Sequence, residues 1–434
     1  MSVKYVTMGL ISKVDKGAYS NIVLNDAFRE FFLSPKEKAF ITEIFYGVIR
    51  NKKFLDYIIE KNTKEIKKEW IRNLLRISIY QITFMNSDDK GVVWEATELA
   101  KKYSVAISKF INGTLRNYLR NKDSELKRLD NEKNYEILYS IPKWFYDTLE
   151  KQYGNDNLKQ AITSLKKIPY LSVRVNKLKY SEEEFEEFLK EKDIQIIKKV
   201  DTVYYVNSGL IINSEEFKTG KIIAQDASSY LAAKNLGVIP NELVLDICAA
   251  PGGKTAVLAE EMKNSGEVIA IDIHQHKIKL IDTNMKKLGI GIVKAIVMDA
   301  RNVNKQGRKF DKILVDVPCS GYGVIRKKPE ILYSKNRENI EELAKLQLEI
   351  LNSAADILKD GGELIYSTCT ITDEENTNNI KKFLEERKEF KVEKLYIPEN
   401  VLGDYDKLGG FCINYKEEIM DNFYIIKLKK GEKC

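Results

Sequence analysis

The sequence predicts a multidomain protein, in which an all-α N-terminal part is followed by a small α+β segment and a doubly wound α/β domain. Three observations support this expectation. Apolar residues recur at helical spacing from Ser20 to Arg120, short alternating runs follow between residues 171 and 212, and from about Val238 strand-like runs alternate with helical segments. We expect the domains to occupy residues 1–130, 135–222 and 223–434.

The first part reads as a helical bundle. Ser34 is a typical N-cap, Pro35 suits the first helical position, and Glu37 completes a capping box. Helical spacing of apolar residues then recurs in three stretches, 40–48, 70–78 and 105–115. The pattern predicts about six or seven helices that pack their apolar faces together.

The middle of the chain predicts a linker and a small α+β domain. The charged run 121–134 has the composition of a linker, and a helix is expected over 141–154, with proline near its start and glycine at its end. An acidic helix is expected over 181–191. Strands are expected over 171–176, 194–200, 203–207 and 210–212.

The last part contains five apolar, β-branched runs separated by helical segments. This alternation predicts a mainly parallel sheet with helices on both faces. The runs are ELVLDI (242–247), EVIAID (267–272), KAIVMD (294–299), KILVDV (312–317) and GELIYS (362–367).

Composition excludes several classes of protein. With 44% hydrophobic and 31% charged residues, and no apolar run near the roughly 18 residues that span a bilayer, the chain is expected to be soluble. The N-terminus lacks the apolar stretch of a signal peptide, so we expect a cytoplasmic protein. The five cysteines lack zinc-site spacing, and His274 and His276 read as solvated helix residues, so no metal is expected.

The charge is unevenly distributed. Residues 1–140 hold 25 Lys+Arg against 18 Asp+Glu, whereas the remaining residues hold 46 of each. An excess of positive charge in one segment favours contact with nucleic acid, although a solvated basic face would give the same composition.

A glycine-containing loop, CAAPGGKT (248–255), follows the first strand of the last domain and opens a helix. Such a loop lets the backbone approach a ligand closely. Gly253, Lys254 and Thr255 match the end of a phosphate-binding P-loop, but Cys248 stands where its first glycine is required. An ATPase is therefore disfavoured.

Three aspartates close successive strands, namely Asp272, Asp299 and Asp316. An acidic residue about 19 positions after the glycines typically accepts hydrogen bonds from ribose hydroxyls. Each aspartate alone could simply cap the turn that follows. Together, beside a loop that is not a P-loop, they fit a cationic nucleoside such as S-adenosylmethionine better than a polyphosphate.

Two cysteines each follow one of the last two strand-like runs. Cys319 lies in DVPCSG and Cys369 in YSTCT. Because the carboxyl ends of parallel strands line the ligand crevice, both thiols are expected at one site, where they suggest covalent chemistry. The other three cysteines, Cys248, Cys412 and Cys434, read as small buried hydrophobes.

These motifs, over residues 220–434, resemble the RNA cytosine-5 methyltransferases of the NOL1/NOP2/Sun class. The first 130 residues resemble the NusB antitermination fold, a combination known from bacterial members that methylate 16S ribosomal RNA. The resemblance implies a NusB-like bundle that binds RNA, an RRM-like α+β insert and a Rossmann-like methyltransferase domain.

The resemblance also implies the roles of the site residues. Cys369 is the nucleophile that adds to carbon 6 of cytosine, Cys319 assists release of the product, and Asp316 contacts the base near N3. The opposite assignment of the two thiols stays open. The residues implied to bind S-adenosylmethionine, with S-adenosylhomocysteine as the product, are Cys248, Ala249, Ala250, Pro251, Gly252, Gly253, Lys254, Asp272, Asp299 and Asp316.

The basic residues Arg326, Lys327 and Lys328 follow the Pro-Cys motif and are expected to meet phosphates, although a solvated basic loop is an equal alternative. The expected partner is 16S rRNA, free or in an early small-subunit particle, bound by a monomer. The same chemistry on tRNA or 23S rRNA, and a non-catalytic RNA-binding or antitermination factor, are the alternatives.

One segment departs from the family pattern. The family usually has an Asp-Gly-Phe-Phe-like string before its last strand, and this chain has Asp421, Asn422, Phe423 and Tyr424. Since asparagine tolerates a positive φ, we expect it to keep the turn. This departure belongs to an atypical segment over residues 409–423.

Overall fold

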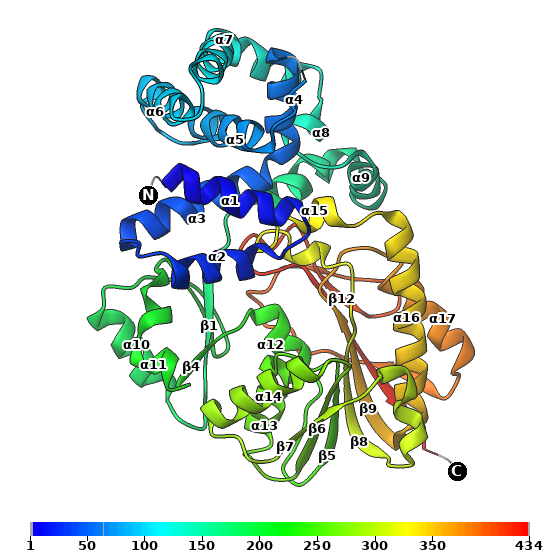
Figure 1. Cartoon of the computed structure of the whole chain (residues 1–434). Coiled ribbons are helices and arrows are strands. Elements are labelled where there is room, and N and C mark those ends of the chain that lie inside the picture. Colours follow the sequence, from blue (N-terminus) through cyan, green and yellow to red (C-terminus); the bar gives the residue numbers. More distant parts are fainter. Residues whose placement is uncertain (1–2, 64, 433–434) are drawn as a thin grey trace. The chain divides into compact units, whose positions relative to one another are not determined.

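The computed structural model describes residues 3–63 and 65–432 (Figure 1). The chain forms two compact units. The helical unit comprises Met1–Lys166 together with Lys327–Ser334, and the sheet-containing unit comprises Lys167–Arg326 and Lys335–Cys434. No helix in the described residues combines the length and the apolar character that are needed to cross a membrane.

The helical unit contains the bundle that the periodicity predicts. Its central helix α5 (Glu69–Phe84) buries Leu74, Leu75 and Ile77 completely against its neighbours. The capping box of Ser34 and Glu37 is confirmed. The other helices are α1 (Val3–Asp15), α2 (Ser20–Glu30), α3 (Pro35–Arg50), α4 (Lys52–Asn62), α6 (Asp89–Lys101) and α7 (Val105–Asn131).

The linker expected over 121–134 is wrong, because α7 continues to Asn131. Glu125 on this helix accepts a hydrogen bond from the hydroxyl of Tyr57 at 2.7 Å and pairs with Lys61 and Arg128. Burial opposes the charge of Glu125, but the hydrogen bonds from Arg128, Lys61 and Tyr57 outweigh it and lower its pKa to about 2. The charged run is therefore the face of a packed helix.

This cluster predicts a pH dependence of stability. A carboxyl whose pKa is lowered on folding stabilises the protein above its unfolded-state pKa, and the contribution is lost as the pH falls toward the folded value. Replacing Glu125 by glutamine should therefore lower the free energy of unfolding by about 2 kcal/mol at pH 7. Urea unfolding of both proteins at several pH values tests this; a difference that stayed constant from pH 6 to pH 2.5 would contradict it.

The helical unit is completed by chain segments that lie before and after the Pro-Cys motif in the sequence. After α8 (Tyr135–Leu138), helix α9 (Lys143–Lys166) is broken at Gly154, which has a φ of 73° and ends the helix expected there. The short helix α15 (Ile331–Ser334), yellow in Figure 1, belongs to the same unit. Glu330 accepts hydrogen bonds from the backbone N–H and the hydroxyl of Ser20 at 3.0 and 2.9 Å. The Tyr333 hydroxyl donates to the carbonyl of Ser140 at 3.0 Å.

The sheet-containing unit begins with a small antiparallel sheet in the order β2-β3-β1-β4. Its strands are β1 (Leu171–Val175), β2 (Ile196–Val200), β3 (Val203–Val206) and β4 (Ile222–Ala224). The acidic helix expected over 181–191 is confirmed as α10 (Glu182–Glu191), which buries Phe185 and Leu189 in the core of this part. The strand expected over 210–212 is wrong: residues Gly209–Asn213 form a 3-10 helix, started by the Ser208 hydroxyl, which accepts a hydrogen bond from the N–H of Leu210.

The large sheet has nine strands, in the order β11-β12-β13-β9-β8-β5-β6-β7, with β10 also paired to β13. Strands β5 to β9 run parallel, and β13 joins β9 antiparallel, so the predicted mainly parallel sheet is confirmed. The strands are β5 (Leu243–Ile247), β6 (Glu267–Asp272), β7 (Val293–Val297), β8 (Phe310–Asp316), β9 (Leu358–Thr368), β10 (Phe390–Glu393), β11 (Asp404–Tyr405), β12 (Phe411–Ile413) and β13 (Phe423–Lys430).

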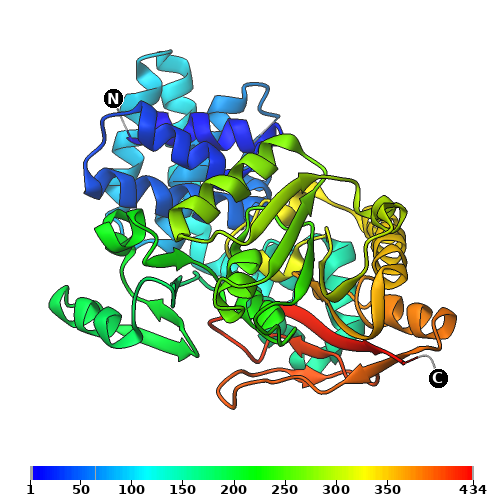
Figure 2. The ribbon, with the colours of Figure 1, turned by 90° about the horizontal axis from the view of Figure 1, so that it is seen from below.

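Helices cover both faces of this sheet (Figure 1). Helices α12 (Ala227–Lys234), α13 (Gly253–Glu261) and α14 (Gln275–Leu288) pack on one face, and α16 (Arg337–Asp356) and α17 (Thr377–Glu386) pack on the other. In Figure 2 the red C-terminal strand β13 lies beside the orange strands near one edge. The strand order reverses between β5 and β8, which is where ligands bind in open α/β sheets.

Candidate active site

The loop between β5 and α13 makes a tight turn, as its glycines predict. Cys248 and Gly252 have positive φ values of 60° and 100°. A Cβ atom on Gly252 would lie 3.0 Å from the methyl group of Met285, so the turn leaves little room for a larger residue there. Burial raises the pKa of the Cys248 thiol to about 12, which keeps this cysteine neutral beside the aspartates.

A buried carboxyl group that the sequence reasoning missed lies beneath this loop. Asp246, at the end of β5, is fully buried and accepts a hydrogen bond from the Thr255 hydroxyl at 2.6 Å. Burial raises its pKa to about 7. Its other oxygen, Oδ1, has no hydrogen-bond partner among the described residues. The available signal was a single acidic residue inside the apolar run LVLDI, one strand position before the loop.

The aspartates after β6 and β7 have local partners. Asp272 is buried and accepts a hydrogen bond from the N–H of His274 at 3.2 Å, and Lys277 pairs with it. Asp299 caps the 3-10 helix η2 (Ala300–Gln306), and hydrogen bonds from Arg301 lower its pKa. Both aspartates therefore cap the turn that follows their strand.

Asp316, at the end of β8, lies in a charged cluster with Lys254. The Lys254 ammonium is 2.8 Å from Asp316 Oδ2, and the Ser367 hydroxyl donates to Asp316 Oδ1 at 2.8 Å. The same ammonium lies 5.4 Å from the ring centre of Phe423. Burial opposes the charge of Lys254, but Asp316 and Cys369 outweigh it and raise its pKa. A permanent positive charge therefore faces both Asp316 and a cysteine.

The two motif cysteines are in contact, as the strand pattern predicts. Cys319, on the loop after β8, and Cys369, directly after β9, have their sulfur atoms 3.0 Å apart, and both residues are half-buried. The hydrogen bond with Cys369, followed by burial, raises the pKa of the Cys319 thiol well above its ordinary value. The two thiols therefore lie in direct hydrogen-bonding contact at the ends of neighbouring parallel strands.

A second residue that the sequence reasoning missed, Glu375, joins the two cysteine loops. It is fully buried and accepts hydrogen bonds from the N–H of Ser320 at 2.8 Å and from the Thr372 hydroxyl at 2.7 Å. The Gln347 amide donates to Glu375 at 2.8 Å and to the carbonyl of Pro318 at 3.0 Å. The carboxylate thus fixes the residues on both sides of the thiol pair.

The position of Glu375 predicts the effect of its replacement. In Glu375→Gln the negative charge that accepts hydrogen bonds from Ser320, Thr372 and Gln347 is lost, and one of its two acceptor oxygens becomes an NH₂ group, so the Pro-Cys loop is held less firmly. Because small displacements of reacting groups cost large factors in rate, we expect a loss of about 10- to 100-fold in kcat. Single-turnover methyl transfer measures this. The neighbouring, half-exposed Glu374→Gln is the matched control, and equal rates for the two variants would contradict the positioning role.

Arg326 does not lie where an RNA contact was expected, and this prediction is corrected. Its side chain is 1% exposed, and its guanidinium donates to the carbonyls of Met420 and Glu417, each at 2.8 Å. The planar guanidinium of Arg326, with its several N–H donors, therefore holds the atypical segment 409–423 in place before β13. Lys327 is half-buried and Lys328 is exposed, and both belong to the helical unit.

The turn before β13 packs against both cysteine loops. The N–H of Gly323 donates to the carbonyl of Cys369 at 3.0 Å, and the N–H of Asn422 donates to the carbonyl of Gly323 at 3.1 Å. A Cβ atom on Gly323 would lie 2.0 Å from the carbonyl oxygen of Asn422. Asn422 does not have the positive φ expected of it, because its backbone leads directly into β13.

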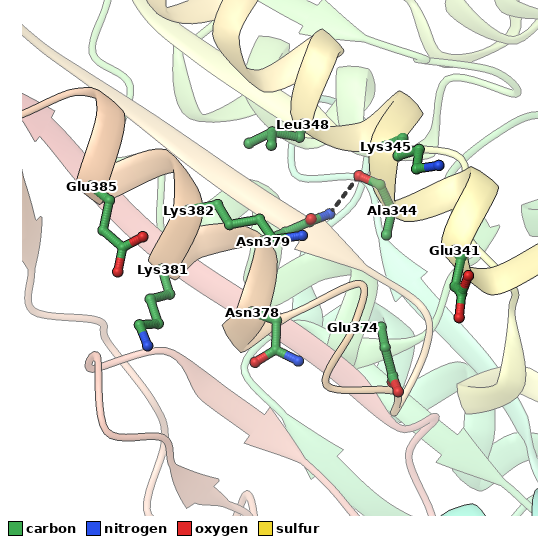
Figure 3. A pocket seen from close by; sticks show the side chains of 10 residues that line it. All are labelled: Glu341, Ala344, Lys345, Leu348, Glu374, Asn378, Asn379, Lys381, Lys382 and Glu385. Atoms are coloured by element: carbon green, nitrogen blue, oxygen red, sulfur yellow. Dashed lines mark hydrogen bonds between the residues drawn. The ribbon is translucent and has the colours of Figure 1, made fainter.

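A separate hollow of about 510 Å³ lies between α16 and α17 (Figure 3). Its lining mixes acidic and basic side chains, among them Glu341, Lys345 and Lys381, and the Asn379 amide donates to the carbonyl of Ala344 across it. None of the cysteine, aspartate or loop residues of the site lines this hollow.

Comparison with known proteins finds a family match for each of the three parts of the chain. Residues 233–429 match the family described as 16S rRNA methyltransferase RsmB/F, residues 1–120 match the NusB family, and residues 141–215 match the RsmF/B-like ferredoxin-like domain. The predicted helical domain, small α+β domain and Rossmann-like methyltransferase domain are therefore confirmed as folds.

Relatives cover nearly the whole chain. A protein of Bacillus subtilis (strain 168), described as a probable ribosomal RNA small subunit methyltransferase B, is 34% identical over 99% of both chains. The ribosomal RNA small subunit methyltransferase B of Shewanella oneidensis is 31% identical over 96% of both. The crystal structure of PH0851 has a TM-score of 0.83 at 29% identity, covering 99% of both chains. The chain thus belongs to the family of ribosomal RNA small subunit methyltransferases B.

Proposed function

We propose that the protein transfers a methyl group from S-adenosylmethionine to carbon 5 of a cytosine in 16S ribosomal RNA, with S-adenosylhomocysteine as the second product. The observation that carries the proposal is the contact of two cysteine sulfurs, 3.0 Å apart, on loops after neighbouring parallel strands. Cytosine C5 is a poor nucleophile, and a second thiol beside the first can assist when the bond formed by the first must later be broken.

In the proposed reaction the Cys369 thiolate attacks carbon 6, and the electrons of the C5–C6 double bond make C5 nucleophilic. The Lys254 ammonium, whose charge faces Cys369, stabilises the attacking thiolate. Asp316, held by Lys254 and Ser367, contacts the base near N3. S-adenosylmethionine supplies an electrophilic methyl group to C5.

Release reverses the first step. A base removes the proton from C5, the double bond forms again, and the bond between C6 and the Cys369 sulfur breaks. The neutral Cys319 thiol, 3.0 Å from that sulfur, can donate a hydrogen bond to it as it leaves. The resemblance of the two cysteine motifs to those of the family supports this division of roles, and the contact between the sulfurs puts Cys319 within reach of the leaving Cys369 sulfur.

The residues around the β5–α13 loop fit S-adenosylmethionine. The ligand has an amino group and a carboxylate, and two buried polar atoms beside the loop lack partners among the described residues: Asp246 Oδ1 and Gln225 Nε2. The Gln225 amide lies 3.6 Å from where a Cβ of Gly253 would be. An acceptor and a donor are therefore available. The residues 248–254 would hold the ligand with Asp272, Asp299 and Asp316.

The relatives' names support 16S rRNA as the substrate, free or in an early small-subunit particle, and we propose that a monomer acts on it in the cytoplasm. Transfer to tRNA or 23S rRNA is the alternative within the same chemistry. A non-catalytic RNA-binding or antitermination factor is less well supported, since it has no use for paired thiols and the carboxylate that joins their loops.

The test combines labelled S-adenosylmethionine with deproteinised 16S rRNA, assembled 30S subunits, 23S rRNA and tRNA, followed by mapping of the modified base. Parallel reactions use RNA carrying tritium at cytosine C5. We expect methylation of 16S rRNA with equal release of tritium, because the C5 proton must leave. Methylation without tritium release would place the methyl group on another atom, and methylation of tRNA or 23S rRNA alone would exclude the 16S substrate.

A further inference from the structure

Helices α6 and α7 of the helical unit enclose a groove of about 730 Å³ that the proposed chemistry does not use. Its floor includes the apolar side chains of Val93 and Leu119, and polar and charged side chains of both helices complete its lining. The residues that matter here are Lys90, Trp94, Asn112, Gly113, Arg116 and Arg120.

The groove is positively charged. Lys90, Arg116 and Arg120 are its charged lining residues, all three are exposed, and no aspartate or glutamate lines it. Arg116 and Arg120 are four residues apart on α7, so both guanidinium groups lie on one face of the helix, where like charges repel. Within residues 3–63 and 65–432 none of these head groups forms an ion pair. An anionic partner would relieve this repulsion.

An exposed tryptophan lies among these cations. Trp94 is 68% exposed, although large aromatic side chains are usually well buried. The flat indole offers a stacking surface, and Asn112 adds a donor and an acceptor to the same groove. Stacking platforms combined with cationic grooves are the usual way to bind single-stranded nucleic acid, whose bases are free to stack.

We propose that the α6–α7 groove binds a single-stranded segment of the RNA substrate, with bases on Trp94 and phosphates at Lys90, Arg116 and Arg120. The inference rests on the proposed function in that the substrate is RNA. An acidic protein partner would match the positive charges of the groove. A single RNA strand supplies both phosphates for the cations and flat bases that stack on the indole of Trp94, so RNA is the better match.

Gly113 offers a precise way to block the groove. It lies inside α7, and a Cβ atom there would meet nothing within 4 Å. Gly113→Glu should therefore fold normally while placing a carboxylate among the cations. Gly113→Ala controls for the change in helix propensity. Gly9→Glu controls for charge, because Gly9 is also exposed, lies inside α1 and has open space around it.

The binding experiment uses the full chain and an unstructured RNA oligonucleotide of about 12 nucleotides. We expect Gly113→Glu to weaken binding at least about tenfold and to flatten its salt dependence, with Gly113→Ala and Gly9→Glu within about twofold of wild type. Quenching of tryptophan fluorescence by the RNA should be lost in Trp94→Leu. Equal affinities for Gly113→Glu and Gly9→Glu would overturn the proposal.

A methyl-transfer assay distinguishes failure of the groove proposal from failure of the proposed function. Wild type that methylates 16S rRNA, together with a Gly113→Glu variant whose KM for that RNA rises while kcat is retained, supports the groove. Wild type that methylates no RNA refutes the proposed function, whatever the oligonucleotide binds. If wild type methylates 16S rRNA and Gly113→Glu has the same KM and the same oligonucleotide affinity, RNA binding at the groove is refuted and the proposed function still stands.

Discussion

Cys369→Ala is expected to abolish methyl transfer, lowering the single-turnover rate by at least about a thousandfold. Without this thiolate, carbon 5 of the cytosine has no means of becoming nucleophilic, and the charge of Lys254 has nothing to stabilise. Affinity for S-adenosylmethionine and for RNA should stay within a few-fold of wild type, since Cys369 is one half-buried side chain of the site. Rapid-quench measurement of labelled methyl groups in RNA tests this.

The neighbouring thiol makes the result informative in either direction. Cys319 lies 3.0 Å from Cys369, so it could reach nearly the same atom of the base. If Cys369→Ala kept its activity and Cys319→Ala lost it at the methylation step, the assignment of the two cysteines would have to be reversed.

Cys319→Ala is expected to trap the enzyme on its product. The first bond still forms, but the Cys369 sulfur loses the hydrogen bond that helps it leave carbon 6. We expect a covalent protein–RNA species that survives denaturant and contains most of the enzyme, together with a fall of about a hundredfold in multiple-turnover rate. Denaturing electrophoresis with labelled RNA measures both quantities.

The double variant Cys319→Ala/Cys369→Ala is the control, since it lacks the attacking sulfur and should form no such species. A Cys319→Ala enzyme that turned over at the wild-type rate without any adduct would show that its thiol has no part in release.

Much of the site could be predicted because its residues follow directly after strands. A strand-like run tells where its carboxyl end lies, so Asp316, Cys319 and Cys369 could be brought to one crevice without a structure. The contact between the two sulfurs bears this out. The Gly252 turn was predictable for the same reason, as glycine accepts its φ of 100° without strain.

The wrong and missing predictions have the opposite cause. Each concerns a residue whose position is determined by partners far away in the sequence. Arg326 looked like part of a basic loop because its carbonyl partners lie more than 90 residues later. The charged end of α7 looked like a linker because Tyr57 and Lys61, which bind Glu125, come from α4. Glu375 gave no local signal, since its importance comes from Ser320 and Gln347 on other elements.

The segment Lys327–Ser334 has a consequence for biosynthesis. The contacts of Ser20 with Glu330 and of Ser140 with Tyr333 mean that the helical unit takes one of its pieces from beyond the Pro-Cys loop. A ribosome adding about 5 to 20 residues per second needs roughly 10 to 30 seconds to proceed from Lys166 to Ser334. During that interval the nascent bundle lacks the hydrogen bonds of Ser20 with Glu330 and of Ser140 with Tyr333. These contacts form only after Cys319 has been added to the chain.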